Sequence, residues 1–292
     1  MEIGDLAALE RPEIKDILFD STSFMRQEQE DMPELRHTDL YTMTVYAQDG
    51  TPLNCRVYEG RADKPHIIYY PAEYETEETL SMLAEGMGEY GFNLISLDYR
   101  GIGQSGGKAS FTAMPSDAET FFLGVKKWMK QDGRQGKLCV MGRSLGCAPA
   151  LMMAEKFEDD LLCLILESAF DRTEDFLKGV GVPVEVVDKC MEQCADPFSN
   201  RKRMQKITKP VMFIHSPRDQ VQTLAQVEWL VAESRSKATQ FQVAPSGTRE
   251  DLAHVAGHLY CAALRQYINL RMGIRPARKP RHKRKAVKQV LQ

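Results

Sequence analysis

The sequence predicts an α/β protein in which a mostly parallel β-sheet lies between two layers of helices. Short runs of four to six apolar residues recur along the chain, and such runs are typical of strands that are buried on both faces. Segments with the helical period of apolar residues separate them. The 292 residues, 43% of them hydrophobic, suit one large α/β domain and are too apolar for a disordered chain.

Eight strands are expected. The first two form a hairpin, because the β-rich runs His37–Tyr46 and Leu53–Tyr58 flank the turn dipeptide Asp49-Gly50. The other six are the apolar runs His66–Tyr70, Phe92–Leu97, Leu138–Met141, Leu161–Leu166, Val211–Ile214 and Phe241–Val243.

Helices are expected between these strands. One is expected to begin at Ser116, because Glu119 three residues later completes a capping-box pattern. The others are predicted at Thr76–Tyr90, Ser144–Phe157, Thr223–Ser236 and 259–270. This alternation of strand and helix implies right-handed crossovers and a three-layer sandwich.

Three regions differ in composition. Residues 1–36 are polar and are interpreted as a leader on the surface, whereas residues 37–270 form the folded domain. Residues 271–292 contain nine Lys and Arg and no acid, although the whole chain carries a net charge of −3. This tail is interpreted as a solvated, disordered end, with contact to an anionic membrane surface or nucleic acid, or a role as a nuclear address, as alternatives.

The cysteines indicate a reducing compartment. Their number is seven, and no CxxC pair occurs among them (positions 55, 139, 147, 163, 190, 194 and 261). The first ten residues lack the basic region of a signal peptide, and no apolar run approaches 18 residues. A cytoplasmic location is therefore expected, with peripheral membrane or nuclear placement through the tail as alternatives. No metal-ligand cluster and no cofactor motif is recognised, so neither a metal nor a cofactor is expected.

The most specific motif is Gly142-x-Ser144-x-Gly146, which lies between an apolar strand and a helix-like segment. A sharp strand-to-helix turn needs small residues two before and two after the serine, because neighbouring backbone comes close there. Chance would produce about 0.1 such triplets in a chain of this length. The pattern predicts a nucleophile elbow, with the hydroxyl of Ser144 raised above the edge of the sheet.

A second block, Asp98-Tyr-Arg-Gly-Ile-Gly-Gln-Ser-Gly-Gly107, lies about 40 residues before this elbow. With both blocks, the sequence resembles the α/β-hydrolases, and within them the ABHD-type, serine-aminopeptidase-like branch of esterases, lipases and thioesterases. The resemblance covers about residues 37–270. It implies the α/β-hydrolase fold, with a mostly parallel eight-stranded sheet and a short lid at about 171–209.

The resemblance also implies the other members of a catalytic triad. Asp219, after the run Val211–Ile214, stands at the position of the acid that orients the imidazole. The base is expected late in the chain, in the order Ser, Asp, His. His254 is the candidate nearer to the last strand and His258 the alternative, whereas His215 is interpreted as structural.

The oxyanion hole needs two N–H groups. Leu145, which follows the nucleophile, supplies one, and Ala72 is expected to supply the other because Pro71 has no N–H. The acidic run Glu73, Glu75, Glu77 and Glu78 is either a rim that repels anionic substrates or an ordinary solvated helix start.

Together these residues predict a serine hydrolase that cleaves a carboxylic ester or thioester through an acyl-enzyme. Two alternatives remain open. One is a catalytically weak hydrolase fold that serves as an interaction module. The other is an acyltransferase that uses the same triad.

Overall fold

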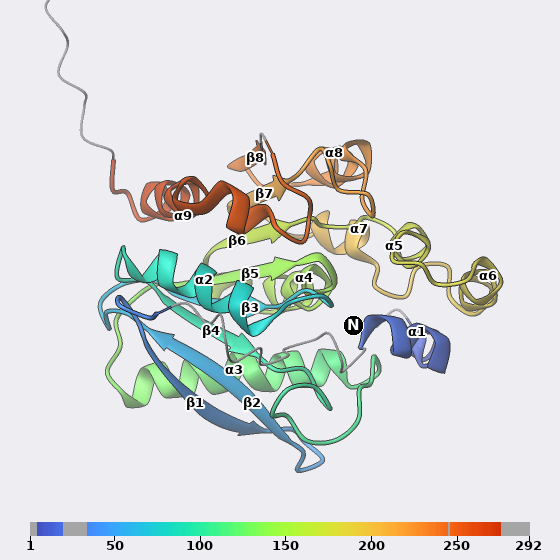
Figure 1. The fold of residues 1–292 in the computed structure, drawn as a ribbon, viewed down its shortest axis with the longest axis horizontal. Coiled ribbons are helices and arrows are strands. Elements are labelled where there is room, and N and C mark those ends of the chain that lie inside the picture. Colours follow the sequence, from blue (N-terminus) through green and yellow to red (C-terminus); the bar gives the residue numbers. More distant parts are fainter. Residues whose placement is uncertain (1–4, 20–33, 245, 276–292) are drawn as a thin grey trace, which may run out of the picture.

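The computed structural model describes residues 5–19, 34–244 and 246–275, and the chain forms one eight-stranded sheet in the order β1-β2-β4-β3-β5-β6-β7-β8 (Figure 1). The strands are β1 (Asp39–Tyr46), β2 (Pro52–Glu59), β3 (His66–Tyr70), β4 (Asn93–Leu97), β5 (Leu138–Arg143), β6 (Leu161–Glu167), β7 (Val211–His215) and β8 (Thr239–Val243). The eight predicted strands are therefore confirmed, and their ends differ from the prediction by at most two residues.

The two front strands are antiparallel, and the other six are parallel to one another. β1 pairs with β2 in the register Tyr46↔Pro52, and β2 pairs antiparallel with β4. β3 pairs in parallel with β5, so that Tyr70 lies opposite Gly142. The carboxyl ends of β3 and β5 to β8 therefore meet at one edge of the sheet, which is where open α/β sheets carry their ligand sites.

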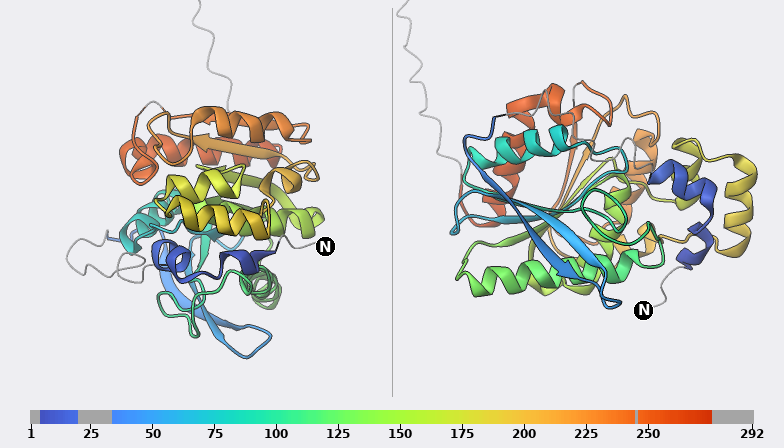
Figure 2. Two further views of the ribbon diagram at one scale, coloured as in Figure 1. Left: turned by 90° about the vertical axis from the view of Figure 1, so that its right-hand side faces the viewer. Right: turned by 60° about the horizontal axis from the view of Figure 1, so that its bottom comes forward.

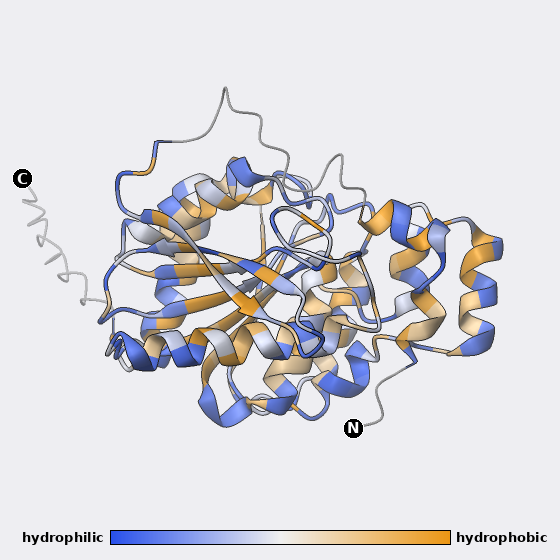
Figure 3. Cartoon of the chain, turned by 90° about the horizontal axis from the view of Figure 1, so that it is seen from below, coloured by the Kyte–Doolittle hydropathy of each residue, from blue (hydrophilic) through white to orange (hydrophobic). Residues whose placement is uncertain are grey.

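Helices cover both faces of the sheet (Figure 2). On one face α2 (Glu77–Gly88) packs against α9 (Leu252–Arg271). The other face is covered by α3 (Met114–Gln131), α4 (Cys147–Lys156), α7 (Asn200–Met204) and α8 (Leu224–Glu233). Apolar residues run along the central strands, and polar residues gather on the outer sides of the helices (Figure 3). No helix in the described part of the chain is long and apolar enough to cross a membrane.

The lid consists of short helices, α5 (Thr173–Gly179) and α6 (Val184–Gln193), followed by α7. The described part of the leader packs beside them in Figure 1, as the short turn η1 (Leu6–Leu9) and α1 (Pro12–Leu18). Leu9, Ile14 and Leu18 are fully buried there. This part of the leader is therefore built into the folded structure. The basic run that begins at Arg278 lies outside the described residues.

Three helix starts differ from the prediction by two residues or more, the first being α4, which begins at Cys147 after a short turn at Ser144–Gly146. The capping box at Ser116 is wrong: α3 begins at Met114, and the Ser116 hydroxyl donates to the carbonyl of Ala113 (2.9 Å) inside the helix. The last helix begins at Leu252, seven residues before the predicted start, with a break at Gly257. All seven cysteines are free thiols, and only Cys194 is not buried.

Candidate active site

The nucleophile elbow forms where β5 ends. Ser144 follows Arg143 directly, opens a short turn (η2, Ser144–Gly146) and leads into α4. Its φ of 49° lies in the left-handed region, which a non-glycine residue adopts only under constraint. A Cβ on Gly142 would overlap the carbonyl oxygen of Gly146, and a Cβ on Gly146 would overlap that of Tyr70. The glycines of the motif are therefore required by the close approach of these chains.

Gly146→Ala is expected to lower the free energy of unfolding by about 3 kcal/mol, because the obstructing atom belongs to rigid backbone. Urea-induced unfolding measures this loss. Gly133→Ala is the control, since a Cβ there meets open space and only the positive φ of 65° is unfavourable, at a cost of about 1 kcal/mol. Equal losses in the two variants would contradict the steric role of Gly146.

A carboxylate and a guanidinium hold the serine. The Ser144 hydroxyl donates to Oε1 of Glu73 (3.2 Å) and accepts from Nη1 of Arg249 (3.1 Å). The N–H of Leu145 donates to Oε2 of the same glutamate (3.2 Å). Nη2 of Arg249 lies 2.5 Å from Oε1 of Glu73 and completes the ion pair. The predicted oxyanion donor Leu145 is thus beside the serine, but its N–H is already bound to a side chain of this protein.

Two loops at the carboxyl edge of the sheet bring these groups together. Glu73 lies between β3 and α2, directly after the buried Ala72, and Arg249 lies between β8 and α9. The Tyr74 hydroxyl donates to the carbonyl of Arg249 (2.8 Å), and the guanidinium lies over the Tyr74 ring at 4.5 Å. Ser144 is completely buried, and Glu73 and Arg249 are only 8% and 6% exposed. The site is therefore closed by its own side chains.

Arg249 carries a positive charge in this site. Burial by itself lowers the pKa of its guanidinium, but Glu73, Tyr74 and Glu250 together outweigh that effect and raise the pKa above its ordinary value. A guanidinium in this state cannot accept a proton. The residue from the loop after β8 that reaches Ser144 is therefore not a base.

The predicted acid, Asp219, lies on the loop after β7, the strand next to β8 in the sheet. Oδ1 of Asp219 accepts from the N–H groups of Val221 and Gln222, both at 2.9 Å. Oδ2 is buried without a hydrogen-bond partner and lies 3.9 Å from Nδ1 of His215. Burial lowers the pKa of His215 against the opposing charge of Asp219, so the ring is neutral at neutral pH. Asp219 therefore keeps one carboxylate oxygen without a donor.

The predicted bases lie on α9, away from the serine. His254 is exposed, with Nδ1 3.4 Å from the sulfur of Met82 on α2. His258 is exposed at a cavity of about 270 Å³ between α2 and α9. Among the described residues, neither imidazole is hydrogen-bonded to Ser144. The structure does not bring the predicted triad together, because α9 begins at Leu252 and carries both histidines into the helix.

The acidic run is neither a repelling rim nor a solvated helix start. Glu75 pairs with Arg143 (2.8 Å) and Glu77 with Arg56 (2.7 Å), and both glutamates are buried. With Glu73 paired to Arg249, three of the four acids are internal ion-pair partners, and only Glu78 is exposed. The charges of these three glutamates are therefore neutralised by ion pairs inside the protein.

Sequence reasoning missed the roles of Glu73 and Arg249. The only signals were positional: Glu73 follows the expected oxyanion donor Ala72, and Arg249 lies between the last strand and the last helix. Neither position has a side-chain pattern that distinguishes a site residue from an ordinary charged loop residue.

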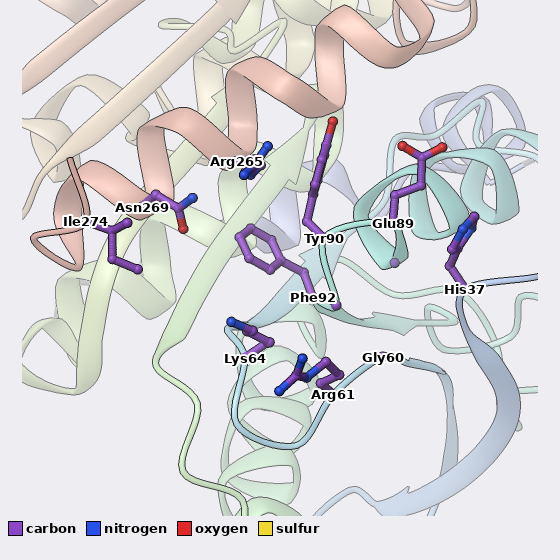
Figure 4. A pocket seen from close by; sticks show the side chains of 12 residues that line it. His37, Gly60, Arg61, Lys64, Glu89, Tyr90, Phe92, Arg265, Asn269 and Ile274 are labelled. Atoms are coloured by element: carbon purple, nitrogen blue, oxygen red, sulfur yellow. The ribbon is translucent and has the colours of Figure 1, made fainter. Parts of the chain in front are cut away.

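A cavity of about 590 Å³ lies at the opposite edge of the sheet, where β3 begins (Figure 4). Lys64, Arg61 and Arg265 border it together with the rings of Tyr90 and Phe92. Ser144 is not among its lining residues, so this space is not the opening to the elbow. In the part of the chain that the structure describes, no group of three His, Cys, Asp or Glu side chains could hold a metal ion.

The chain is similar to several known proteins. It is 30% identical over 129 residues to Alpha/beta hydrolase domain-containing protein 17B of Homo sapiens, a match that covers 44% of this chain and 41% of the relative. It is 26% identical over 223 residues to Protein ABHD12B of Homo sapiens, with coverages of 73% and 59%. The chain thus spans roughly half of the length of these two relatives.

The fold has well-defined structural relatives. The esterase Pf2001 of Pyrococcus furiosus superimposes with a TM-score of 0.65 at 16% identity, over 82% of this chain and 97% of that one. Alpha/beta hydrolase domain-containing protein 10 from mouse superimposes with a TM-score of 0.59 at 16% identity, over 79% and 99% of the two chains. At these identities the comparison establishes the fold alone.

The sequence profile described as the alpha/beta hydrolase fold matches residues 73–251, which is more than half of the chain. The match begins at Glu73 and ends two residues after Arg249, so it includes the elbow, Asp219 and the loop after β8. The chain belongs to the alpha/beta hydrolase fold family.

Proposed function

We propose that this protein is a serine hydrolase that cleaves a carboxylic ester or thioester through an acyl-enzyme on Ser144, and that its turnover is slow. The observation that carries the proposal is the strained elbow, where the Ser144 hydroxyl and the Leu145 amide contact the same carboxylate. A carbonyl carbon attacked by Ser144 develops its negative charge on an oxygen, and a backbone N–H beside the serine stabilises that charge.

The reaction begins with the attack of the Ser144 oxygen on the substrate carbonyl. The Leu145 N–H, with that of Ala72 as the proposed second donor, binds the oxygen of the tetrahedral intermediate. Glu73 must leave the Leu145 amide first, because the amide cannot serve a carboxylate and an oxyanion at once. The intermediate collapses by breaking the bond to the alcohol or thiol, which leaves with the proton of the Ser144 hydroxyl, and an acyl-enzyme remains. Water then attacks the acyl carbon, the acid is released, and the second proton of the water restores the Ser144 hydroxyl.

Slow turnover follows from the surroundings of the hydroxyl. A positioned general base accelerates such reactions by about 10²–10⁴. The groups at the Ser144 hydroxyl are Arg249, which cannot take a proton, and Glu73, which would have to give up its ion pair to accept one. Asp219 and His254, with His258 as the alternative base, complete the proposed triad only if the segment from β8 into α9 rearranges toward the serine.

A fluorophosphonate probe tests this proposal, because it labels an activated serine. We expect slow labelling and weak hydrolysis of p-nitrophenyl esters, and we expect both to disappear in Ser144→Ala. Ser168→Ala is the matched control: Ser168 also directly follows a strand with a φ of 49°, but the hydrogen bonds that hold Ser144 do not involve it, so its variant should keep both signals. Equal turnover by wild type and Ser144→Ala would contradict a nucleophilic Ser144.

A binding module without turnover is the second candidate. It is favoured by the closed site, in which Glu73 and Arg249 occupy the positions around the nucleophile. A folded wild-type protein that is neither labelled by the probe nor active on any ester or thioester would support this candidate.

A further inference from the structure

Both carboxylate oxygens of Glu73 accept hydrogen bonds from the groups that surround them. Oε1 is bound by the Ser144 hydroxyl and by Arg249, and Oε2 is bound by the Leu145 N–H. Hydrogen bonds between a guanidinium and a carboxylate are among the strongest in proteins. An amide or an alcohol in the same place would lack the charge that Arg249 requires and one of the two acceptor oxygens.

We infer that Ser144, the Leu145 amide and Arg249 form a binding site for the carboxylate of an external carboxylic acid, and that Glu73 occupies this site until such a ligand displaces it. The inference deepens the proposed function, because a carboxylic acid is the product of ester and thioester hydrolysis. It concerns binding alone and does not require turnover.

The charged groups around Arg249 indicate that the carboxylate paired with it can be exchanged for another. Its Nε contacts Glu250 at 2.8 Å, and the Glu250 side chain is about half exposed to solvent. Glu73 is its buried partner. When Glu73 leaves, the buried guanidinium loses that partner, and an incoming carboxylate restores both the charge balance and the hydrogen bonds.

Glu73 competes as a tethered ligand. A group attached near its site acts at a high effective concentration, in the millimolar range for short flexible tethers and higher when it is pre-organised. Wild-type protein is therefore expected to bind small carboxylates weakly. Glu73→Ala removes the competitor and leaves space of about the size of its carboxymethyl group, which suits acetate.

The test is the binding of acetate, with acetamide as the neutral ligand of nearly the same shape. Isothermal titration calorimetry and the shift of the melting temperature are measured on wild type, Glu73→Ala and Glu73→Ala/Arg249→Gln. We expect Glu73→Ala to bind acetate at least about tenfold more tightly than wild type, not to bind acetamide, and to lose acetate binding when Arg249→Gln is added.

Glu73→Gln keeps the volume of the side chain and provides a second variant should Glu73→Ala not fold. It is expected to bind acetate more tightly than wild type by a smaller factor. The inference is overturned if the folded variants bind acetate no better than wild type, if acetamide binds equally well, or if Arg249→Gln has no effect. Because no readout depends on turnover, these outcomes are independent of whether the probe labels Ser144.

Discussion

Arg143→Met is expected to lower the free energy of unfolding by about 3–5 kcal/mol, the usual loss when one member of a buried ion pair is removed. The Arg143 side chain is 1% exposed and lies between Glu75 (2.8 Å) and Glu167 (3.1 Å), which are completely buried. The hydroxyl groups of Tyr69 and Tyr260 donate hydrogen bonds to these two carboxylates. Without the guanidinium, two carboxylates remain in the interior directly beneath the elbow.

Urea-induced unfolding at neutral pH measures this effect, and Arg61→Met is the matched control. Arg61 pairs with Asp63 on the surface, with side chains 67% and 60% exposed, and exposed pairs contribute at most about 1 kcal/mol. In Arg143→Met/Glu75→Gln/Glu167→Gln most of the stability should return, because no unpaired charge remains. A loss in Arg143→Met no larger than that in Arg61→Met would contradict the role of this network.

The loss should also depend on pH. Burial raises the pKa of Glu167 above its ordinary value of 4.5, although the charge of Arg143 opposes this. Removing that charge raises the pKa of the folded form further. A carboxyl group whose pKa is higher in the folded than in the unfolded state binds more protons when folded, so stability falls as pH rises through that range. The deficit of Arg143→Met is therefore expected to be largest at neutral pH and to shrink as pH falls toward 4.5.

The sheet could be predicted from the sequence because its strands are buried on both faces. All five residues of β3 are buried, and the apolar run His66–Tyr70 marks its two ends correctly. β8 is less clear, because its residues are half-buried or exposed, and the apolar pattern found only its last three residues. The elbow could be predicted because the close contact of neighbouring backbones requires glycine at positions 142 and 146. Gly142 and Gly146 are therefore visible in the sequence as a short motif.

The side chains that surround the serine could not be predicted in the same way. Glu73 and Arg249 are 176 positions apart, and their contact depends on the packing of two loops at the edge of the sheet. Distance along the chain from β8 suggested His254, but α9 begins at Leu252 and directs that histidine toward Met82. Local patterns report backbone requirements and burial, whereas partners from distant loops are determined by the tertiary structure.

Glu73→Ala/Arg249→His is expected to raise the rate of p-nitrophenyl ester hydrolysis above that of wild type by at least about tenfold. The first change frees the Leu145 amide for an oxyanion, and the second introduces an imidazole on the loop that already reaches Ser144. Asp219, on the neighbouring loop after β7, keeps one carboxylate oxygen without a donor and is available to orient a ring. The imidazole is shorter than the arginine side chain, so the loop has to approach the serine, and the position emptied by Glu73 gives it room.

Three further variants test the separate roles of the introduced base, of Ser144 and of Asp219. Glu73→Ala/Arg249→Gln opens the site without adding a base and should gain little, since freeing the amide leaves the serine unactivated. Adding Ser144→Ala to the histidine variant should abolish the gained activity, and adding Asp219→Asn should reduce it, because an asparagine amide cannot stabilise the imidazolium that forms. If the histidine variant folds and hydrolyses esters no faster than the glutamine variant, then Arg249 does not occupy the position from which a base could act. If Asp219→Asn leaves the gained rate unchanged, the acid assigned from the sequence takes no part in the reaction.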